Sequence, residues 1–239
     1  MPPVSLRSAR DRCKSPTNHC TASSELASLE VRLGKAIRQF PDWPQKGILF
    51  EDIMPIFTSP QLHSDLITAL ELQIKEAFPT KPDAIVALES RGFLFGPTLA
   101  LRLGCAFVPV RKPGKLPGPV ETASFVKEYG KDEFQIQKEA IKEGQNVIVV
   151  DDLLATGGSA GAAGKLVKQS GGKLLGFVFL IELGFLDGRS KLEAPVYTVL
   201  KGQNEDKDEK NLPLGQTKES ASEVKPVQGA GGASQSQQP

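Results

Sequence analysis

Residues 147–159 read Val-Ile-Val-Val-Asp-Asp-Leu-Leu-Ala-Thr-Gly-Gly-Ser, and this stretch decides the fold class. The β-branched run at 147–150 predicts a strand that is buried on both faces. Two adjacent acids follow at its carboxyl end, and after the Thr-Gly-Gly-Ser turn residues 160–169 predict a helix of small side chains. A buried strand that leads through a tight turn into a helix is the repeating unit of a parallel α/β sheet.

The turn after this strand is suited to a phosphate monoester. Gly157 and Gly158 allow a tight turn with exposed N–H groups, and the first turn of the following helix adds further unpaired N–H donors. Asp151 and Asp152 would repel a phosphate, but they can accept hydrogen bonds from vicinal hydroxyls. Ligands of open α/β sheets bind just beyond the carboxyl ends of the strands. Acids for a diol beside a cradle for a phosphate describe a ribose 5-phosphate site.

The same alternation of strand and helix recurs along the chain. Leucine, isoleucine and phenylalanine at helical spacing predict an N-terminal helix that begins after Ser23 or Ser24 and includes Leu26, Leu29, Leu33, Ile37 and Phe40. Ser59-Pro60 predicts the start of a second helix. Further strands are expected over 84–88, 106–110 and 175–181, and a helix over 95–103. This order predicts an α/β fold with a parallel sheet flanked by helices and right-handed crossovers.

Residues 111–136 interrupt this pattern. Their first part is rich in turn-forming residues, namely Pro113, Gly114, Pro117, Gly118 and Pro119, and an alternating stretch follows. A long segment of this kind between core strands is expected to be either a flexible lid loop or a disordered insertion.

The composition predicts one domain with polar ends. Residues 1–23 and 202–239 contain too little apolar surface to offset the entropy of ordering, so we expect disordered termini around a domain at 24–201. The net charge of +1 favours neither nucleic acid nor an anionic membrane as a partner. Three cysteines suit a reducing compartment and predict a cytoplasmic protein. The Arg- and Ser-rich start leaves a mitochondrial transit peptide as the alternative.

Three further segments concern the same chemistry. Residues 40–52 read Phe-Pro-Asp-Trp-Pro-Gln-Lys-Gly-Ile-Leu-Phe-Glu-Asp, and residues 89–97 read Glu-Ser-Arg-Gly-Phe-Leu-Phe-Gly-Pro. Residues 111–118 read Arg-Lys-Pro-Gly-Lys-Leu-Pro-Gly, with Glu-Tyr-Gly at 128–130. With residues 147–159, these four ordered motifs resemble the adenine phosphoribosyltransferases, of the type I phosphoribosyltransferase fold, and most of all the fungal type. The resemblance extends from about Leu26 to Leu200.

The resemblance implies a role for each motif. Asp151 and Asp152 would hold the ribose hydroxyls, and Glu128, next to Tyr129 on the lid, would handle the proton of the purine. The 5-phosphate would be bound by Ala155, Thr156, Gly157, Gly158 and Ser159. The diphosphate would be bound by Ser90, Arg91, Arg111, Lys112 and Lys115. The base would be bound by Leu49, Phe50 and Leu153, with Phe50 and Leu153 on its two faces.

The resemblance also implies a reaction and its partners. The substrates would be adenine and 5-phosphoribosyl 1-diphosphate, and the products AMP and diphosphate, as in purine salvage. Mg²⁺ would be held mainly by the substrate and water, with no direct protein ligand. The family is homodimeric, and it carries a cis peptide bond at the position of Glu89-Ser90.

Two other functions fit parts of the sequence. One is a phosphoribosyltransferase for another base, such as hypoxanthine or xanthine. Glu51 stands where many family members carry arginine, which leaves open which side chain, if any, reads the edge of the base. The other is a regulator without catalytic activity that senses the diphosphate. Such regulators usually need an attached DNA-binding module, for which residues 1–23 are too short.

Overall fold

The computed structural model describes residues 17–127 and 130–203. The chain divides into two compact units, which are residues 1–39 with 51–205, and residues 40–50 with 206–239. In the described ranges, no helix combines the length and the apolar character that crossing a membrane requires.

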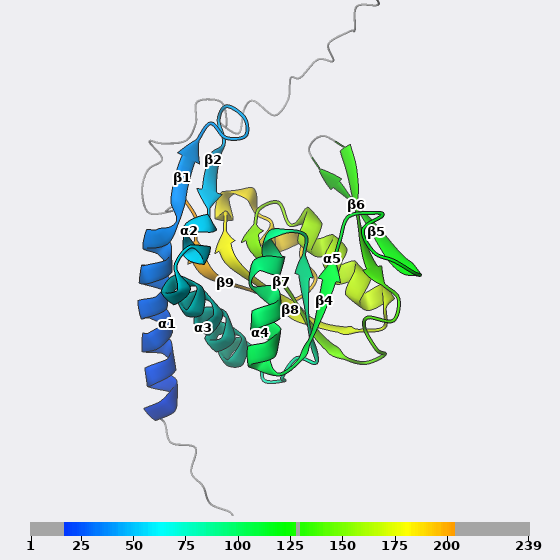
Figure 1. The fold of residues 1–239 in the computed structure, drawn as a ribbon, viewed down its shortest axis with the longest axis horizontal. Coiled ribbons are helices and arrows are strands. Elements are labelled where there is room, and N and C mark those ends of the chain that lie inside the picture. Colours follow the sequence, from blue (N-terminus) through cyan, green and yellow to red (C-terminus); the bar gives the residue numbers. More distant parts are fainter. Residues whose placement is uncertain (1–16, 128–129, 204–239) are drawn as a thin grey trace, which may run out of the picture. The chain divides into compact units, whose positions relative to one another are not determined.

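A five-stranded parallel sheet forms the centre of the larger unit (Figure 1). Its strand order is β4 (Ala106–Val110), β3 (Ala84–Leu88), β7 (Asn146–Leu154), β8 (Lys173–Glu182) and β9 (Val196–Lys201). All four neighbouring pairs are parallel. The α/β class and its strands are therefore confirmed, and β7 occupies the middle of the sheet.

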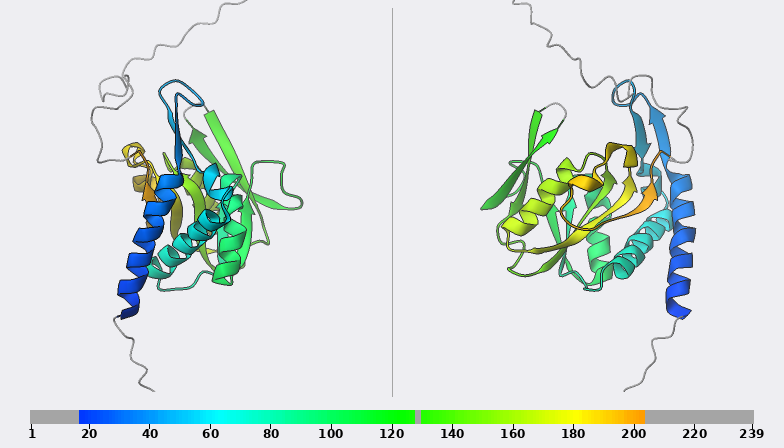
Figure 2. Two further views of the ribbon diagram at one scale, coloured as in Figure 1. Left: turned by 60° about the vertical axis from the view of Figure 1, so that its left-hand side comes forward. Right: turned by 180° about the vertical axis from the view of Figure 1, so that it is seen from behind.

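Alternate residues of each strand point to opposite faces of the sheet, and each face has its own core. Ile85 and Ala87 of β3 face the helices α1 (Thr17–Ala36), α3 (Pro60–Ala77) and α4 (Gly96–Leu103). Ala84 and Val86 face the helix α5 (Gly158–Gln169). The views in Figure 2 show α3 and α4 on one side of the sheet and α5 on the other. Burial on both faces explains why the central strands are continuous apolar runs.

Most helix boundaries agree with the sequence. The hydroxyl of Ser59 accepts a hydrogen bond from the backbone N–H of Leu62 at 3.3 Å, which caps α3. The helix α4 ends at Gly104, whose φ of 63° lies in the left-handed region that favours glycine. The short elements are α2 (Met54–Phe57) and the 3₁₀ turns η1 (Arg91–Leu94), η2 (Gly184–Leu186) and η3 (Arg189–Lys191).

The prediction for the first helix was wrong at both ends. The helix α1 starts at Thr17 rather than after Ser23 or Ser24, since serine is tolerated inside a helix. It ends at Ala36, and Ile37 and Phe40 lie beyond it. The chain instead forms the strands β1 (Arg38–Pro41) and β2 (Leu49–Asp52), which make a two-stranded sheet. Prolines disfavour helical backbone at the residue before them, so Pro41 and Pro44 favour the extended form.

The Gly- and Pro-rich segment leads into a β-hairpin. The strands β5 (Val120–Lys127) and β6 (Gly130–Gln137) pair antiparallel, from Val120 with Gln137 to Lys127 with Gly130. Phe125 and Phe134 stack with ring centroids 5.1 Å apart and are buried in the core that also contains α5. The strands therefore belong to the folded body rather than to a disordered insertion, and residues 128–129 between them lie outside the described ranges.

Candidate active site

The central strand carries the two acids further into the sheet than the sequence suggested. We expected β7 to end at Val150, but it continues to Leu154, and Asp151 lies opposite Phe179 of β8. The neighbouring strand β8 is long enough to supply backbone partners for these extra residues, and this pairing overrides the polar character of the acids. The side chain of Asp152 is consequently buried, with only 3% of the residue exposed.

Arg91 in η1 neutralises part of this buried charge. Its Nε lies 3.0 Å from Oδ2 of Asp152. The next residue, Gly92, packs so closely that a Cβ there would come within 3.0 Å of Oδ1 of Asp151. Loss of hydration, together with the negative charge of Asp152, raises the pKa of Asp151 well above its ordinary value. Loss of hydration also raises the pKa of Asp152, although Arg91 opposes this effect.

The turn that the sequence predicts to be a phosphate cradle lies directly after β7 and leads into α5. Gly157 has a φ of 79°, a left-handed conformation that suits glycine, and α5 begins at the next residue. The N–H groups of the first helical turn lie at this point, where the helix dipole also favours an anion. Backbone from the following loop packs against the cradle, because a Cβ on Gly157 would lie 2.5 Å from the carbonyl oxygen of Gly188.

One cavity joins the acids to the cradle. Its volume is about 330 Å³. Most of the predicted ribose, phosphate and diphosphate residues line it, namely Ser90, Arg91, Lys112, Asp151, Asp152 and Ala155 to Ser159. The turn at its edge contains the expected cis peptide bond between Glu89 and Ser90. The structure thus brings together residues from β3, β7 and α5 that are distant in the sequence.

The remaining predicted basic residues do not line the cavity. Arg111 is held by Glu89, with NH2 3.2 Å from Oε1, and its NH1 donates to the backbone oxygen of Lys115 at 3.1 Å. Glu89 also accepts a hydrogen bond from the backbone N–H of Lys112 at 3.1 Å. The hydrogen bond from Arg111 is the main reason why the pKa of Glu89 is lowered.

The predicted base-binding residues fall in different units. Leu153 lines the cavity of the larger unit, whereas Leu49 and Phe50 belong to the smaller unit. Within that unit the rings of Trp43 and Phe50 lie edge to face, with centroids 4.3 Å apart. The predicted lid residues Glu128 and Tyr129 lie outside the described residues.

The sequence reasoning missed several residues of the site, among them Glu89, Phe134 and Gly188. Glu89 lines the cavity and orients Arg111, and its position directly after the buried strand β3 was a signal that could have identified it. Phe134 also lines the cavity, although its place in an alternating strand gave no such signal. Gly188 supports the cradle through contacts between backbones, which no sequence pattern indicates.

Comparison with known proteins agrees with this geometry. The family model of the phosphoribosyl transferase domain matches residues 58–215. The chain is 57% identical over 181 residues to adenine phosphoribosyltransferase of Debaryomyces hansenii, a match that covers 76% of this chain and 96% of the relative. The chain belongs to the adenine phosphoribosyltransferase family. The resemblance inferred from the four motifs is therefore confirmed, and this adenine phosphoribosyltransferase is an enzyme that transfers phosphoribosyl groups.

Other family members extend the comparison. Adenine phosphoribosyltransferase 1 of Saccharomyces cerevisiae is 59% identical over 181 residues, which are 75% of this chain and 97% of the relative. A crystal structure of the Saccharomyces cerevisiae enzyme, complexed with adenine and an imino-altritol bisphosphate, matches with a TM-score of 0.72 and 60% identity, over 73% of this chain and 99% of that chain. The Thermoanaerobacter pseudethanolicus enzyme matches with a TM-score of 0.69 and 46% identity, over 72% of this chain and 99% of that one. The chain thus shares the fold of these two enzymes over about three quarters of its length.

Proposed function

We propose that this adenine phosphoribosyltransferase transfers the 5-phosphoribosyl group of 5-phosphoribosyl 1-diphosphate to adenine, producing AMP and diphosphate. The observation that carries this proposal is the single cavity in which two carboxylates, the guanidinium of Arg91 and a helix N-terminus lie together. These groups complement, in turn, a ribose diol, a diphosphate and a 5-phosphate.

The arrangement also matches the charges that develop during the transfer. When diphosphate leaves C1 of the ribose, positive charge grows on the sugar and negative charge on the leaving group. The carboxylates of Asp151 and Asp152 stabilise the sugar, and the cations of Arg91 and Lys112 stabilise the leaving group. Arg91 is paired with Asp152, so substrate binding would give Arg91 the diphosphate as its partner and Asp152 the ribose hydroxyls.

Arg111 and Lys115 would act at the edge of the site. Arg111 contacts the backbone of Lys115, and Glu89 holds its guanidinium beside the turn that carries Ser90. A movement of the loop at 112–119 would release the charged groups toward the diphosphate. Their present position outside the cavity is compatible with a lid that closes over bound substrate.

Recognition and deprotonation of the purine are assigned from the family resemblance. Phe50 and Leu153 would enclose the ring, next to Leu49, and Glu128 beside Tyr129 would accept the N9 proton as this atom becomes the nucleophile. The replacement of Glu128 by glutamine should lower kcat by about 10²-fold or more and leave the affinity for 5-phosphoribosyl 1-diphosphate nearly unchanged. An unchanged kcat would contradict this role.

Magnesium is the cofactor that this substrate requires. Within the described residues no group of three or more potential metal-ligating side chains occurs, and of the three carboxylates that line the cavity Glu89 is held by Arg111, which leaves Asp151 and Asp152. This donor set suits Mg²⁺, which keeps several waters and binds substrate oxygens. The bound ion would neutralise charge on the diphosphate, and Asp151 and Asp152 would contact it mainly through water and the ribose hydroxyls.

The oligomeric state and the compartment belong to the same proposal. Leu94 of η1 and Leu101 of α4 are 41% and 81% exposed, which suits an interface in a homodimer, whereas Phe95 between these two elements is buried in the core. Sedimentation at about twice the chain mass of 25.7 kDa would support the dimer.

The free thiol of Cys105 and the odd number of cysteines favour the cytoplasm. Imaging of the tagged chain in cells would distinguish a cytoplasmic from a mitochondrial location.

The reaction is tested by its stoichiometry. Purified protein is mixed with labelled adenine, 5-phosphoribosyl 1-diphosphate and Mg²⁺, and both AMP and diphosphate are measured. We expect equal amounts of the two products, and no reaction when chelator removes the metal ion. Diphosphate release without AMP would indicate hydrolysis instead of transfer and would overturn the proposal.

A further inference from the structure

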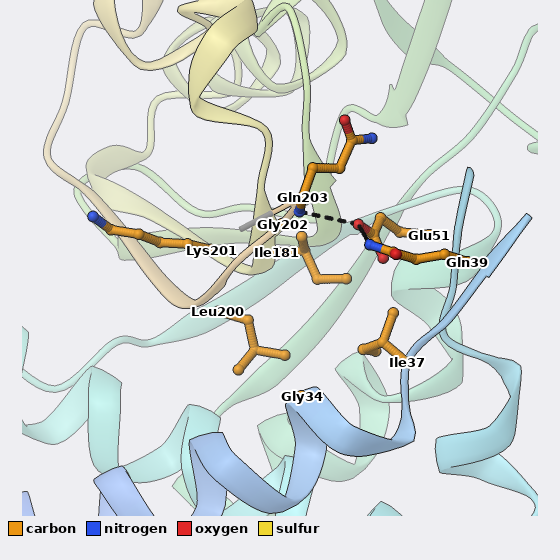
Figure 3. Close-up of a pocket in the computed structure, with 9 residues that line it drawn as sticks. All are labelled: Gly34, Ile37, Gln39, Glu51, Ile181, Leu200, Lys201, Gly202 and Gln203. Carbon is orange, nitrogen blue, oxygen red and sulfur yellow. Dashed lines mark hydrogen bonds between the residues drawn. The ribbon is translucent and has the colours of Figure 1, made fainter. Parts of the chain in front are cut away.

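A second cavity lies at the carboxyl ends of β8 and β9 and shares no lining residue with the cavity at Asp151 and Asp152. Its volume is about 310 Å³, at the lower end of the roughly 300–1,000 Å³ typical of small-molecule sites. Figure 3 shows its apolar side chains, Ile37, Ile181 and Leu200, with Glu51 and Gln39 at one end. The cavity thus combines an apolar wall with one acidic group.

The acidic group, Glu51, is held firmly in place. Only 5% of the residue is exposed. Its Oε1 accepts a hydrogen bond from Nε2 of Gln39 at 2.9 Å and another from the backbone N–H of Gln203 at 3.1 Å. Gln203 has a φ of 53°, and this left-handed turn after β9 directs its N–H group to the carboxylate. Donors from two other segments therefore fix the orientation of this side chain.

The negative charge of Glu51 has no opposite charge beside it among the described residues. Both hydrogen bonds come from neutral groups, and both reach Oε1 rather than Oε2. The nearby Arg38 pairs with Asp52, with its Nε at 3.0 Å from Oδ2. Lys201 also lines the cavity, but its ammonium group points away from it (Figure 3). Buried carboxylates are normally paired with a cation, because the loss of hydration is costly.

We infer that this cavity is a binding site for a small organic cation, an ammonium or amidinium group on a compact apolar body. The cationic group would donate to Oε2 of Glu51, and the apolar body would contact Ile37, Ile181 and Leu200. A metal ion suits the cavity less, since Mg²⁺ and Ca²⁺ take several oxygen ligands and the lining supplies one carboxylate. An anion would be repelled by the same charge.

The test uses benzamidinium as the probe and benzamide as its neutral counterpart, with binding to the full-length chain measured by calorimetry. We expect one benzamidinium per chain and at least about tenfold weaker binding of benzamide, because a charge-assisted hydrogen bond is the stronger kind. Glu51→Gln should weaken benzamidinium by about tenfold or more. Equal affinity of Glu51→Gln and the wild type would overturn the inference.

A second variant keeps the test decisive if Glu51→Gln does not fold. Gly34 of α1 lines the cavity, and a Cβ there would meet only Leu200, at 3.9 Å. Gly34→Leu should therefore fill the cavity and abolish benzamidinium binding, while the loss of a helical glycine favours folding. Retained binding in this variant would overturn the inference.

Two controls test which cavity holds the benzamidinium and whether residues 204–239 compete with it. Asp152→Asn should bind benzamidinium like the wild type, and a loss of binding there would place the probe in the other cavity and overturn the inference. The titration is repeated on a chain that ends at Gln203. If benzamidinium bound only to this shorter chain, the cavity would still be a cation site, and a cationic side chain from residues 204–239 would be what competes with the probe in the full-length chain. The absence of binding to both chains would contradict the site.

Discussion

At the scale of single residues, the acids Asp151 and Asp152 are adjacent at the end of β7, where burial and mutual repulsion disfavour their charged forms. Arg91 contributes one ion pair, and the end of β7 holds both carboxylates in fixed positions. This arrangement is costly without substrate, as the raised pKa values of both acids indicate. A bound ribose with its diphosphate would supply hydroxyl donors to the acids and a new partner to Arg91.

Asp152→Asn is expected to lower kcat/KM by about 10²-fold, since it removes one preorganised charge from the transition state. The fold should survive, because asparagine has nearly the same shape. Glu193→Gln serves as the control, since Glu193 is an acid paired with Lys168 outside the cavity. Steady-state kinetics of the two variants would show the difference, and turnover of Asp152→Asn within twofold of the wild type would refute the role.

The raised pKa of Asp151 predicts how stability depends on pH. The carboxylate of Asp151 binds a proton more readily in the folded state than in the unfolded state, where its pKa is near the ordinary value of 3.8. The contribution to stability is therefore present below that value, and it is lost as the pH rises through the raised pKa. We expect the free energy of unfolding of the wild type, relative to Asp151→Asn, to fall as the pH rises from about 4 through the raised pKa of Asp151. Urea titrations of both proteins without substrate measure this, and a constant difference would show that Asp151 titrates normally.

At the scale of secondary-structure elements, the phosphate cradle depends on the loop behind it. A Cβ on Gly188 would lie 2.1 Å from the carbonyl oxygen of Ala155 and 2.9 Å from the backbone nitrogen of Gly157. The atoms that this Cβ would meet belong to the backbone, so the overlap cannot be relieved by rotating a side chain. The loop with η2 and η3 thus fixes the position of the N–H groups at the start of α5.

Gly188→Ala should therefore displace the cradle. We expect KM for 5-phosphoribosyl 1-diphosphate to rise about tenfold, with a smaller change in KM for adenine, and a loss of about 1–3 kcal/mol in stability. Gly161→Ala is the matched control in α5, because its Cβ would make only an ordinary contact at 3.8 Å with Leu192. Equal KM values in the two variants would show that Gly188 does not support the cradle.

The sequence predicted those elements in which local pattern and tertiary packing agree. Val147 to Val150 and the strand at 84–88 are apolar runs buried on both faces, and both were placed correctly. The sequence placed the end of β7 wrongly, because pairing with β8 extends a strand through polar residues. The support from Gly188 could not be predicted either, since it arises from a contact between segments about thirty residues apart in the chain.

At the scale of the whole molecule, the polar C-terminal segment is expected to be dispensable for catalysis. Residues 204–239 lie outside the described residues, and their composition offers few apolar side chains for packing. Deletion of residues 204–239 should leave the melting temperature and kcat/KM for both substrates nearly unchanged. A fall of several degrees, measured by calorimetry, would show that the segment stabilises the folded chain.

The choice of base tests the central claim most directly. The family to which the chain belongs predicts a pocket that accepts the exocyclic amine of adenine, where hypoxanthine presents an oxygen. Mismatched hydrogen-bonding groups in a dry pocket can separate two substrates by about 10⁴-fold. The decisive measurement is kcat/KM for adenine and for hypoxanthine at saturating 5-phosphoribosyl 1-diphosphate. We predict a preference for adenine of this size, and comparable values for the two bases would contradict the account.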